Sequence, residues 1–168
     1  MISKDKITQI FCSIDDFCLV FEPALVKRQL STGKKTRKRK FTMSTSEIVT
    51  ITVLFHLSGI RTFKHFYISY VQEQLKEEFP NTVSYNRFVE LMQANILPLT
   101  LYMKSCCLGQ CTGISFIDST PIRACNKKRI RQNKVFKNIA NIGKSTMGWF
   151  YGFKLHIIIN DKGELLDF

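Results

Sequence analysis

The sequence has no acidic residue in its two most basic tracts. Residues 119–160 contain nine Lys or Arg and no Asp or Glu, and residues 27–40 contain eight and none. The rest of the chain carries 8 basic and 13 acidic side chains, so the net charge of +12 comes from these two tracts alone. Lysines that merely aid solubility are expected to be scattered. Positive charge concentrated in this way indicates a polyanionic partner.

The sequence also lacks a long uninterrupted apolar segment. Charges break the N-terminus "MISKDKITQIFCSIDDF", and the runs "ILPLTLYM" and "WFYGFKLHIII" are too short or too interrupted to span a bilayer. We therefore expect no export signal, no membrane association and a cytoplasmic location.

Among the six cysteines there is no C-x-x-C pair, and no His stands at ligand distance from a cysteine pair. This spacing argues against a zinc site. A disulfide framework is the other alternative, but without an export signal free thiols are the better interpretation.

Apolar residues at helical spacing predict a helix in segment 1–30, which Pro23 either interrupts or divides into two. Residues 31–43 follow as an exposed linker or arm, because like charges this close repel one another in a regular element. Contact with phosphates or with the minor groove is the functional interpretation of its cations, and a solvated segment is the alternative. These cations are Lys34, Lys35, Arg37, Lys38, Arg39 and Lys40.

Further helices are predicted after the basic arm. Ser44, with a glutamate three residues on, forms a capping box for a helix that Gly59 ends. A second helix is expected over residues 62–79. A third begins after Ser84, and Pro98 kinks it or splits it in two.

The pattern changes to strands after residue 108. "GISFID" predicts a short strand that ends at Asp118, and "GWFYGFKLHIIIN" predicts a long one. "ELLDF" predicts a third strand, antiparallel to the second through the turn "NDKG". The sequence stops within that strand and leaves an open sheet with a bare face, so we expect it to be the N-terminal piece of a longer protein.

Asp118 is a single acid at the start of the basic tract. The turn formers Ser119-Thr120-Pro121 follow it, so an Asx-turn at the strand end is the plain structural alternative. Phosphoryl-transfer sites need carboxylates to hold Mg²⁺, and they need Lys and Arg to hold the nucleic-acid backbone. Asp118 beside an acid-free basic loop supplies one part of each.

The ordered motifs "IDSTP", "GKSTMGWFYGFKLH" and "NDKGEL" resemble the first part of the catalytic domain of bacterial insertion-sequence transposases of the DDE type. The similarity is greatest to the insertion-sequence 982 family, whose N-terminal half the helical region around "SYNRFVELM" also resembles. The resemblance implies a helical DNA-binding region at residues 44–108 and an incomplete RNase H-like domain at residues 109–168. The expected fold class is α+β, with a helical N-terminal bundle followed by the first antiparallel strands of a truncated RNase H-like domain.

The resemblance also implies a chemistry. Asp118 would be the first metal-binding acid of a catalytic triad that uses Mg²⁺ or Mn²⁺ for DNA cleavage and strand transfer in transposition. The later Asp and Glu of that triad do not follow here, since Asp161, Glu164 and Asp167 lie in the hairpin turn and the next strand. We therefore expect this chain alone to bind Mg²⁺ very weakly, to cleave no strand, and to retain DNA binding.

The expected partners are double-stranded DNA at element ends and, in an oligomer, a second copy or an intact transposase. Backbone contact is the favoured role of the cations beside Asp118, and a solvated flexible loop is the alternative. These cations are Arg123, Lys127, Lys128, Arg129, Arg131, Lys134, Lys137 and Lys144. His156 is interpreted as a packed strand residue rather than a base, and Trp149 as a core residue rather than a base-stacking one.

Two other functions remain open at this point. The main alternative is a non-enzymatic DNA-binding regulator or inhibitor of the intact transposase, complete at this length. A nuclease of another RNase H-like kind would need acids that this sequence lacks.

Overall fold

The computed structural model describes residues 2–31 and 42–168. The chain divides into two compact units, residues 1–103 and residues 104–168, and each is described by itself. The first is helical and the second is built on a sheet, so the predicted α+β class is confirmed. The basic arm residues Lys34, Lys35, Arg37, Lys38, Arg39 and Lys40 lie outside the described residues.

The helical unit contains most of the predicted helices, with shifted ends. Pro23 lies inside the first helix without ending it, so the expected interruption there is wrong. The last predicted helix is split at Asn95, and Pro98 stands in the first turn of its second half, where its missing N–H needs no helical partner. The elements are α1 (Lys4–Ser31), α2 (Thr45–Ser58), α3 (Phe63–His65), η1 (Phe66–Gln74), α4 (Tyr85–Ala94) and α5 (Ile96–Cys106).

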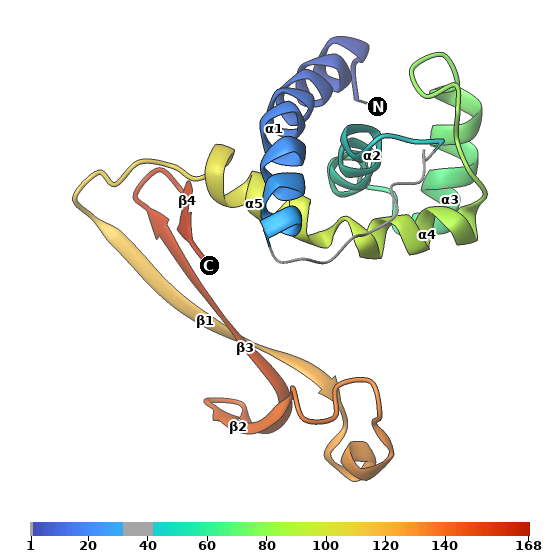
Figure 1. Cartoon of the computed structure of the whole chain (residues 1–168). Coiled ribbons are helices and arrows are strands. Elements are labelled where there is room, and N and C mark those ends of the chain that lie inside the picture. The colour runs from blue at the N-terminus through green and yellow to red at the C-terminus, as the bar shows by residue number, and fades with distance from the viewer. Residues whose placement is uncertain (1, 32–41) are drawn as a thin grey trace. The chain divides into compact units, whose positions relative to one another are not determined.

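Helix α2 begins and ends where the sequence predicts. The Ser44 hydroxyl accepts from the Glu47 backbone N–H at 3.1 Å, and the Glu47 carboxylate accepts from the Ser44 N–H at 2.7 Å. Gly59 ends the helix with a positive φ of 69°. These local signals fix the position of α2, which lies between α1 and α4 (Figure 1).

The segment predicted as one α-helix over residues 62–79 is not a continuous α-helix in the structure. It begins as α3 and continues as η1, a wider π-helix, in which the Leu75 N–H donates to the Tyr70 carbonyl five residues back at 3.0 Å. Phe66 and Tyr67 are fully buried there. The Tyr67 ring packs 4.5 Å from that of Phe88 on α4, at the centre of the helical core.

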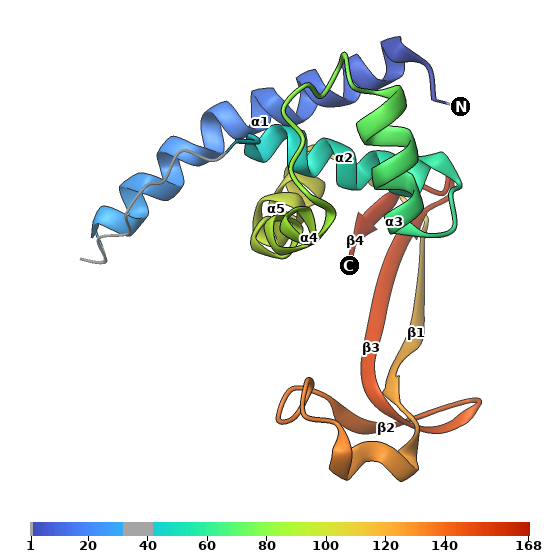
Figure 2. The same cartoon turned by 90° about the vertical axis from the view of Figure 1, so that its right-hand side faces the viewer.

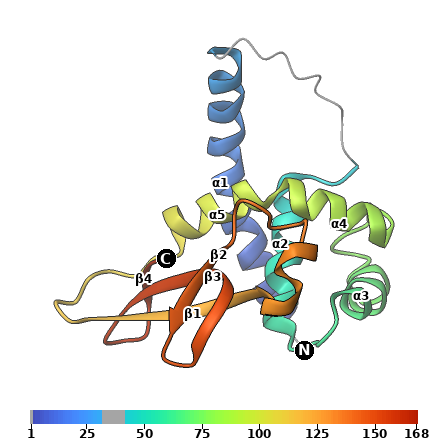
Figure 3. The same cartoon turned by 90° about the horizontal axis from the view of Figure 1, so that it is seen from below.

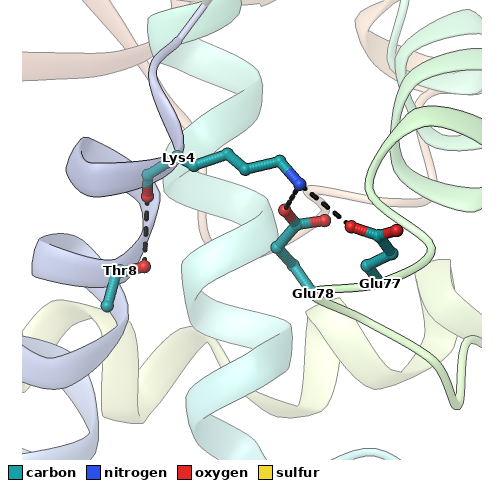
Figure 4. A network of polar contacts seen from close by, with 4 residues as sticks. All are labelled: Lys4, Thr8, Glu77 and Glu78. Carbon is teal, nitrogen blue, oxygen red and sulfur yellow. Dashed lines mark hydrogen bonds and ion pairs between the residues drawn. The ribbon is translucent and has the colours of Figure 1, made fainter.

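The main core of this unit is formed chiefly by α1, α2, η1 and α4. Its buried members are Ile7, Met43, Ile48, Ile51, Leu54, Phe66, Tyr67, Tyr70, Val71, Leu75, Phe79, Phe88 and Leu91. At its edge, Lys4 binds Glu77 at 3.0 Å and Glu78 at 2.9 Å, and so joins the start of α1 to the loop after η1 (Figure 4). Hydrogen bonding to Glu78 and Glu77 raises the pKa of Lys4. Because Lys4 and Glu77 are exposed, this ion pair adds little, and the apolar core supplies most of the stability.

The second unit is a four-stranded antiparallel sheet centred on β3 (Gly148–Asn160). β1 (Ser115–Cys125) pairs with β3 along most of its length. On the other edge of β3, β2 (Asn141–Ser145) pairs with its first residues and β4 (Leu165–Asp167) with its last. The short 3₁₀ helix η2 (Lys127–Gln132) connects β1 to the β2 region, at the opposite end of β3 from β4 (Figure 2).

This sheet differs from the prediction in two respects. The sequence predicts a first strand that stops at Asp118, whereas β1 continues to Cys125. The strand β2 was not predicted, because its five residues "NIGKS" have no apolar alternation of their own and are defined by pairing with β3. The predicted long strand, the turn and β4 are confirmed.

All six cysteines lie in the described residues and are present as thiols rather than in disulfides, as expected. Within residues 2–31 and 42–168, no helix has both the length and the apolar character needed to cross a bilayer.

Tyr67 provides a test of the helical core. Its buried hydroxyl donates to the Val83 carbonyl at 2.7 Å, and burial raises the pKa of Tyr67 from 10.0 to about 12. Because the pKa of Tyr67 is higher in the folded state, the protonated hydroxyl contributes to the free energy of unfolding. This contribution is complete below pH 10 and is lost as the pH rises toward 12. We expect Tyr67→Phe to lower the free energy of unfolding by about 1 kcal/mol at neutral pH, with the difference from wild type shrinking above pH 10.

Urea unfolding across this pH range measures both effects. Tyr85→Phe is the matched control, since Tyr85 lies beside Tyr67 at a ring distance of 6.4 Å and is only half-buried. It should change stability by less than about 0.5 kcal/mol. A Tyr67→Phe deficit that stays constant up to the highest pH would contradict the assignment.

Candidate metal ligand and nucleic-acid interface

Asp118 lies in the middle of β1, directly opposite Ile157 of β3. The alternation of side chains along antiparallel strands places it on the same face as its neighbours two residues away, Phe116 and Thr120. Across the sheet this face is apolar, with Phe153, Leu155, Ile157 and Ile159 on β3. The Asp118 side chain is exposed and has no hydrogen-bond or ion-pair partner in the described part of the chain.

The predicted turn after Asp118 is wrong. Ser119, Thr120 and Pro121 continue the strand and pair with His156, Leu155 and Lys154 of β3. Within the described sheet β1 is an edge strand, and an edge strand tolerates proline because the ring nitrogen has no ladder bond to give up. The Asx-turn explanation of Asp118 therefore fails, because the residue stands within a strand.

The three other acids of this unit are engaged elsewhere. Asp161 accepts a hydrogen bond from the Thr112 hydroxyl, and Glu164 accepts one from Asn160 at 2.7 Å. Asp167 binds Lys104 at 3.0 Å, and this hydrogen bond lowers the pKa of Asp167. Asn160, which binds Glu164, stands three residues along β3 from Ile157, the residue opposite Asp118. This spacing corresponds to about 10 Å along the strand.

No cluster of three acidic, histidine or cysteine side chains suited to a metal ion occurs among residues 2–31 and 42–168. Asp118 fits a hard divalent cation as an exposed carboxylate, but nothing in the described residues joins it as a second side-chain ligand. The described residues therefore contain one candidate ligand and no complete metal site.

The predicted DNA-binding cations gather at the other end of the sheet. All eight are exposed, and none forms an ion pair in the described residues. They come from the end of β1, from η2 and the segment after it, and from β2: Arg123, Lys127, Lys128, Arg129, Arg131, Lys134, Lys137 and Lys144. Arg123 is five strand residues from Asp118, which is about 17 Å. The charge of the sheet is thus graded along β3, from acids near β4 to unpaired cations near β2.

The basic segment between β1 and β2 is held to the sheet by specific contacts. Asn126 caps η2 by accepting from the Lys128 N–H at 3.2 Å. Beyond η2, the Phe136 ring packs edge-on to Phe153 at 5.4 Å, and the Tyr151 hydroxyl donates to the Phe136 carbonyl at 3.4 Å. These contacts favour a structured cationic surface over the alternative of a loose solvated loop.

Sequence reasoning missed one feature of this end. Trp149 was interpreted as a core residue, but it is 55% exposed. Its neighbour across the hairpin, Lys144, has its Nζ 5.9 Å from the indole centroid. Lys144 is brought opposite Trp149 by the pairing of β2 with β3, and β2 was not predicted from the sequence.

Comparison with known proteins connects this sheet to a family. The family model described as "Transposase DDE domain" matches residues 108–168, almost the whole second unit. This part of the chain is therefore similar to the DDE domain of transposases. Neither a curated protein nor a solved structure matches the chain.

Gly152 tests the pairing that positions Asp118 and Arg123. A Cβ at this position would lie 2.0 Å from the Ile122 carbonyl oxygen and 2.8 Å from the Ala124 nitrogen, both of them backbone atoms of β1. We expect Gly152→Ala to lower the opening free energy of the β1 amides by about 3 kcal/mol, the upper end of overpacking costs. Hydrogen exchange of the full chain measures this loss directly.

Gly163→Ala is the matched control. Gly163 has a positive φ of 78° but open space around it, so the substitution adds backbone strain of about 1 kcal/mol without a clash. Equal losses of protection in the two variants would show that strain, rather than the close approach of β1 to β3, explains the need for glycine.

Proposed function

We propose that this chain acts in DNA transposition, with residues 104–168 as part of an RNase H-like catalytic domain of a DDE-type transposase. The observation that carries the proposal is the Transposase DDE domain match over residues 108–168. The antiparallel strands β1, β3 and β4, with an acid on the first of them, are compatible with such a domain. The insertion-sequence 982 family is the proposed subgroup, on the motifs named above.

Asp118 is the proposed metal-binding acid of this domain. Its exposure and its lack of a protein partner support this role, because they leave both carboxylate oxygens accessible to a hard divalent cation. A bound divalent cation would supply activation of a nucleophile and stabilisation of the leaving oxygen. With one carboxylate from the described residues, the chain alone binds such an ion weakly and does not cleave DNA.

The cationic end of the sheet is the proposed surface for the DNA backbone. Eight exposed cations without acidic partners match the phosphate charge and require no sequence code. By contrast, residues 44–108 carry five basic and five acidic residues, so DNA binding by the predicted helical region has no electrostatic support there. A DNA-binding regulator without catalysis is the second candidate, favoured by the lack of a second acid beside Asp118 in the described residues.

Neutralising the cationic end tests DNA binding. We expect the triple variant Arg129→Gln, Arg131→Gln, Lys134→Gln to weaken binding to all duplex sequences alike. The slope of log affinity against log salt should fall by about 0.9 for each phosphate that the variant no longer neutralises. Lys162→Gln, which neutralises an exposed lysine in the turn beside β4, should leave the slope unchanged. A wild-type slope in the triple variant would assign the phosphate contacts to other residues, such as the tract at residues 27–40.

Manganese binding tests Asp118 separately. In a solution of the full chain with duplex DNA, the free Mn²⁺ signal in electron paramagnetic resonance reports the bound fraction. We expect Asp118→Asn to weaken Mn²⁺ binding to the protein–DNA complex by at least about tenfold, since a metal ligand is lost. Asp161→Asn is the matched control and should have no effect. Equal Mn²⁺ binding by wild type and Asp118→Asn would favour the non-catalytic regulator.

A plasmid-nicking assay completes this test. The purified chain in Mg²⁺ or Mn²⁺ should leave supercoiled DNA intact, because the described residues give a cation one carboxylate only. Nicking by the wild type that Asp118→Asn abolishes would show that the chain completes its metal site by a route outside these residues.

A further inference from the structure

Three aromatic side chains follow one face of β3 at every second residue, and only the first of them is uncovered. Strand alternation places Trp149, Tyr151 and Phe153 on the same face. Phe136 packs against Phe153 at 5.4 Å and accepts a hydrogen bond from the Tyr151 hydroxyl, so this segment covers the two inner aromatic residues. Tyr151 is 7% exposed and Trp149 is 55% exposed.

Trp149 is held in this open position by a tight hairpin. A two-residue turn joins the adjacent strands β2 and β3 (Figure 3). Gly148, the first residue of β3, has a positive φ of 101°, and its carbonyl accepts from the Ser145 hydroxyl at 3.2 Å. Lys144 and Trp149 stand directly opposite each other in the pairing. The 5.9 Å from Lys144 Nζ to the indole centroid is at the outer limit of a cation–π contact, so the lysine lies near the ring without being tightly bound to it.

We propose that the β2–β3 hairpin binds an unpaired nucleotide of single-stranded DNA, whose base stacks on Trp149 while Lys144 contacts its phosphate. An exposed indole next to a cation is the combination used for nucleic acid without sequence preference. The charge around it is complementary to such a ligand, because residues 119–160 contain no acid and the covering segment carries Lys134 and Lys137. This inference rests on the proposed DNA-binding function and deepens it.

Stacking on Trp149 selects unpaired over paired DNA. A base in a duplex has both faces covered by its neighbours, whereas an unpaired base offers a free face to the indole. The eight cations bind the duplex backbone equally well without Trp149. Trp149 therefore adds affinity for a frayed end, a gap or a free strand, and adds nothing for intact duplex.

The only tryptophan of the chain is Trp149, so its fluorescence reports this site alone. We expect a short oligothymidine to quench the emission of the full chain, and a blunt duplex of equal charge to bind without quenching. Affinities measured by anisotropy of labelled oligothymidine should fall about tenfold in Trp149→Ala and less than about threefold in Trp149→Phe, which keeps an aromatic face. Ile142→Ala, a change at a 60% exposed apolar residue of the same hairpin, is the control and should keep the wild-type affinity.

The outcomes separate this proposal from the proposed function. Binding of both DNAs without quenching would overturn the stacking site and leave the transposase proposal standing. Equal quenching by the duplex would overturn the preference for unpaired nucleotides. Failure of both DNAs to bind would overturn both proposals. Emission that shifts with protein concentration in the absence of DNA would identify a second copy of the chain as the occupant of Trp149, which also overturns the stacking site.

Discussion

The antiparallel pairing of β1 with β3 determines where the side chains of Asp118 and Arg123 lie. Its register places Asp118 opposite Ile157 and Arg123 opposite Gly152. At that second position the two backbones approach so closely that a glycine is required. Because side chains alternate along both strands, a shift by one residue would transfer Asp118 to the face of His156 and Lys154. The position of the carboxylate is therefore a property of the strand pair, not of the residues next to it.

Charge is separated along the sheet. Near β4, the acids Asp161, Glu164 and Asp167 have donors from their own unit, so they are committed to holding the turn and the chain after α5. Near β2, the cations have no such partners and keep their charge for another molecule. Exposed ion pairs add little to stability, but unpaired cations repel one another. This end of the sheet is thus more favourable with a polyanion bound than without one.

The parts of the fold that depend on local chemistry could be predicted from the sequence, and the parts that depend on pairing could not. The ends of α2 follow from Ser44 and Gly59, whose side-chain cap and positive φ act within one turn. The continuation of β1 through Pro121 was hidden, because Ser-Thr-Pro is typical of turns and only an edge position makes it compatible with a strand. The exposure of Trp149 was equally hidden, because it depends on Phe136, thirteen residues away, covering Phe153 instead. Asp118 could be identified as a candidate because it is isolated among cations. Its position inside a strand that continues to Cys125 could not be predicted.

The position of Asp118 within β1 limits which kinds of element can cover this face of the sheet. Asp118 shares its face with apolar side chains that are themselves exposed, including Phe116 at 56% and Ile122 at 49%. Burying those side chains is favourable, but any element laid over them also removes water from the Asp118 carboxylate, at a cost of several kcal/mol unless a cation is buried with it. Packing a purely apolar element on this face is therefore disfavoured by the cost of desolvating the Asp118 carboxylate. A cover that brings a divalent ion, or a basic side chain, is favoured by the carboxylate and by the apolar surface together. Burial of this face of the sheet is therefore coupled to the arrival of positive charge at Asp118.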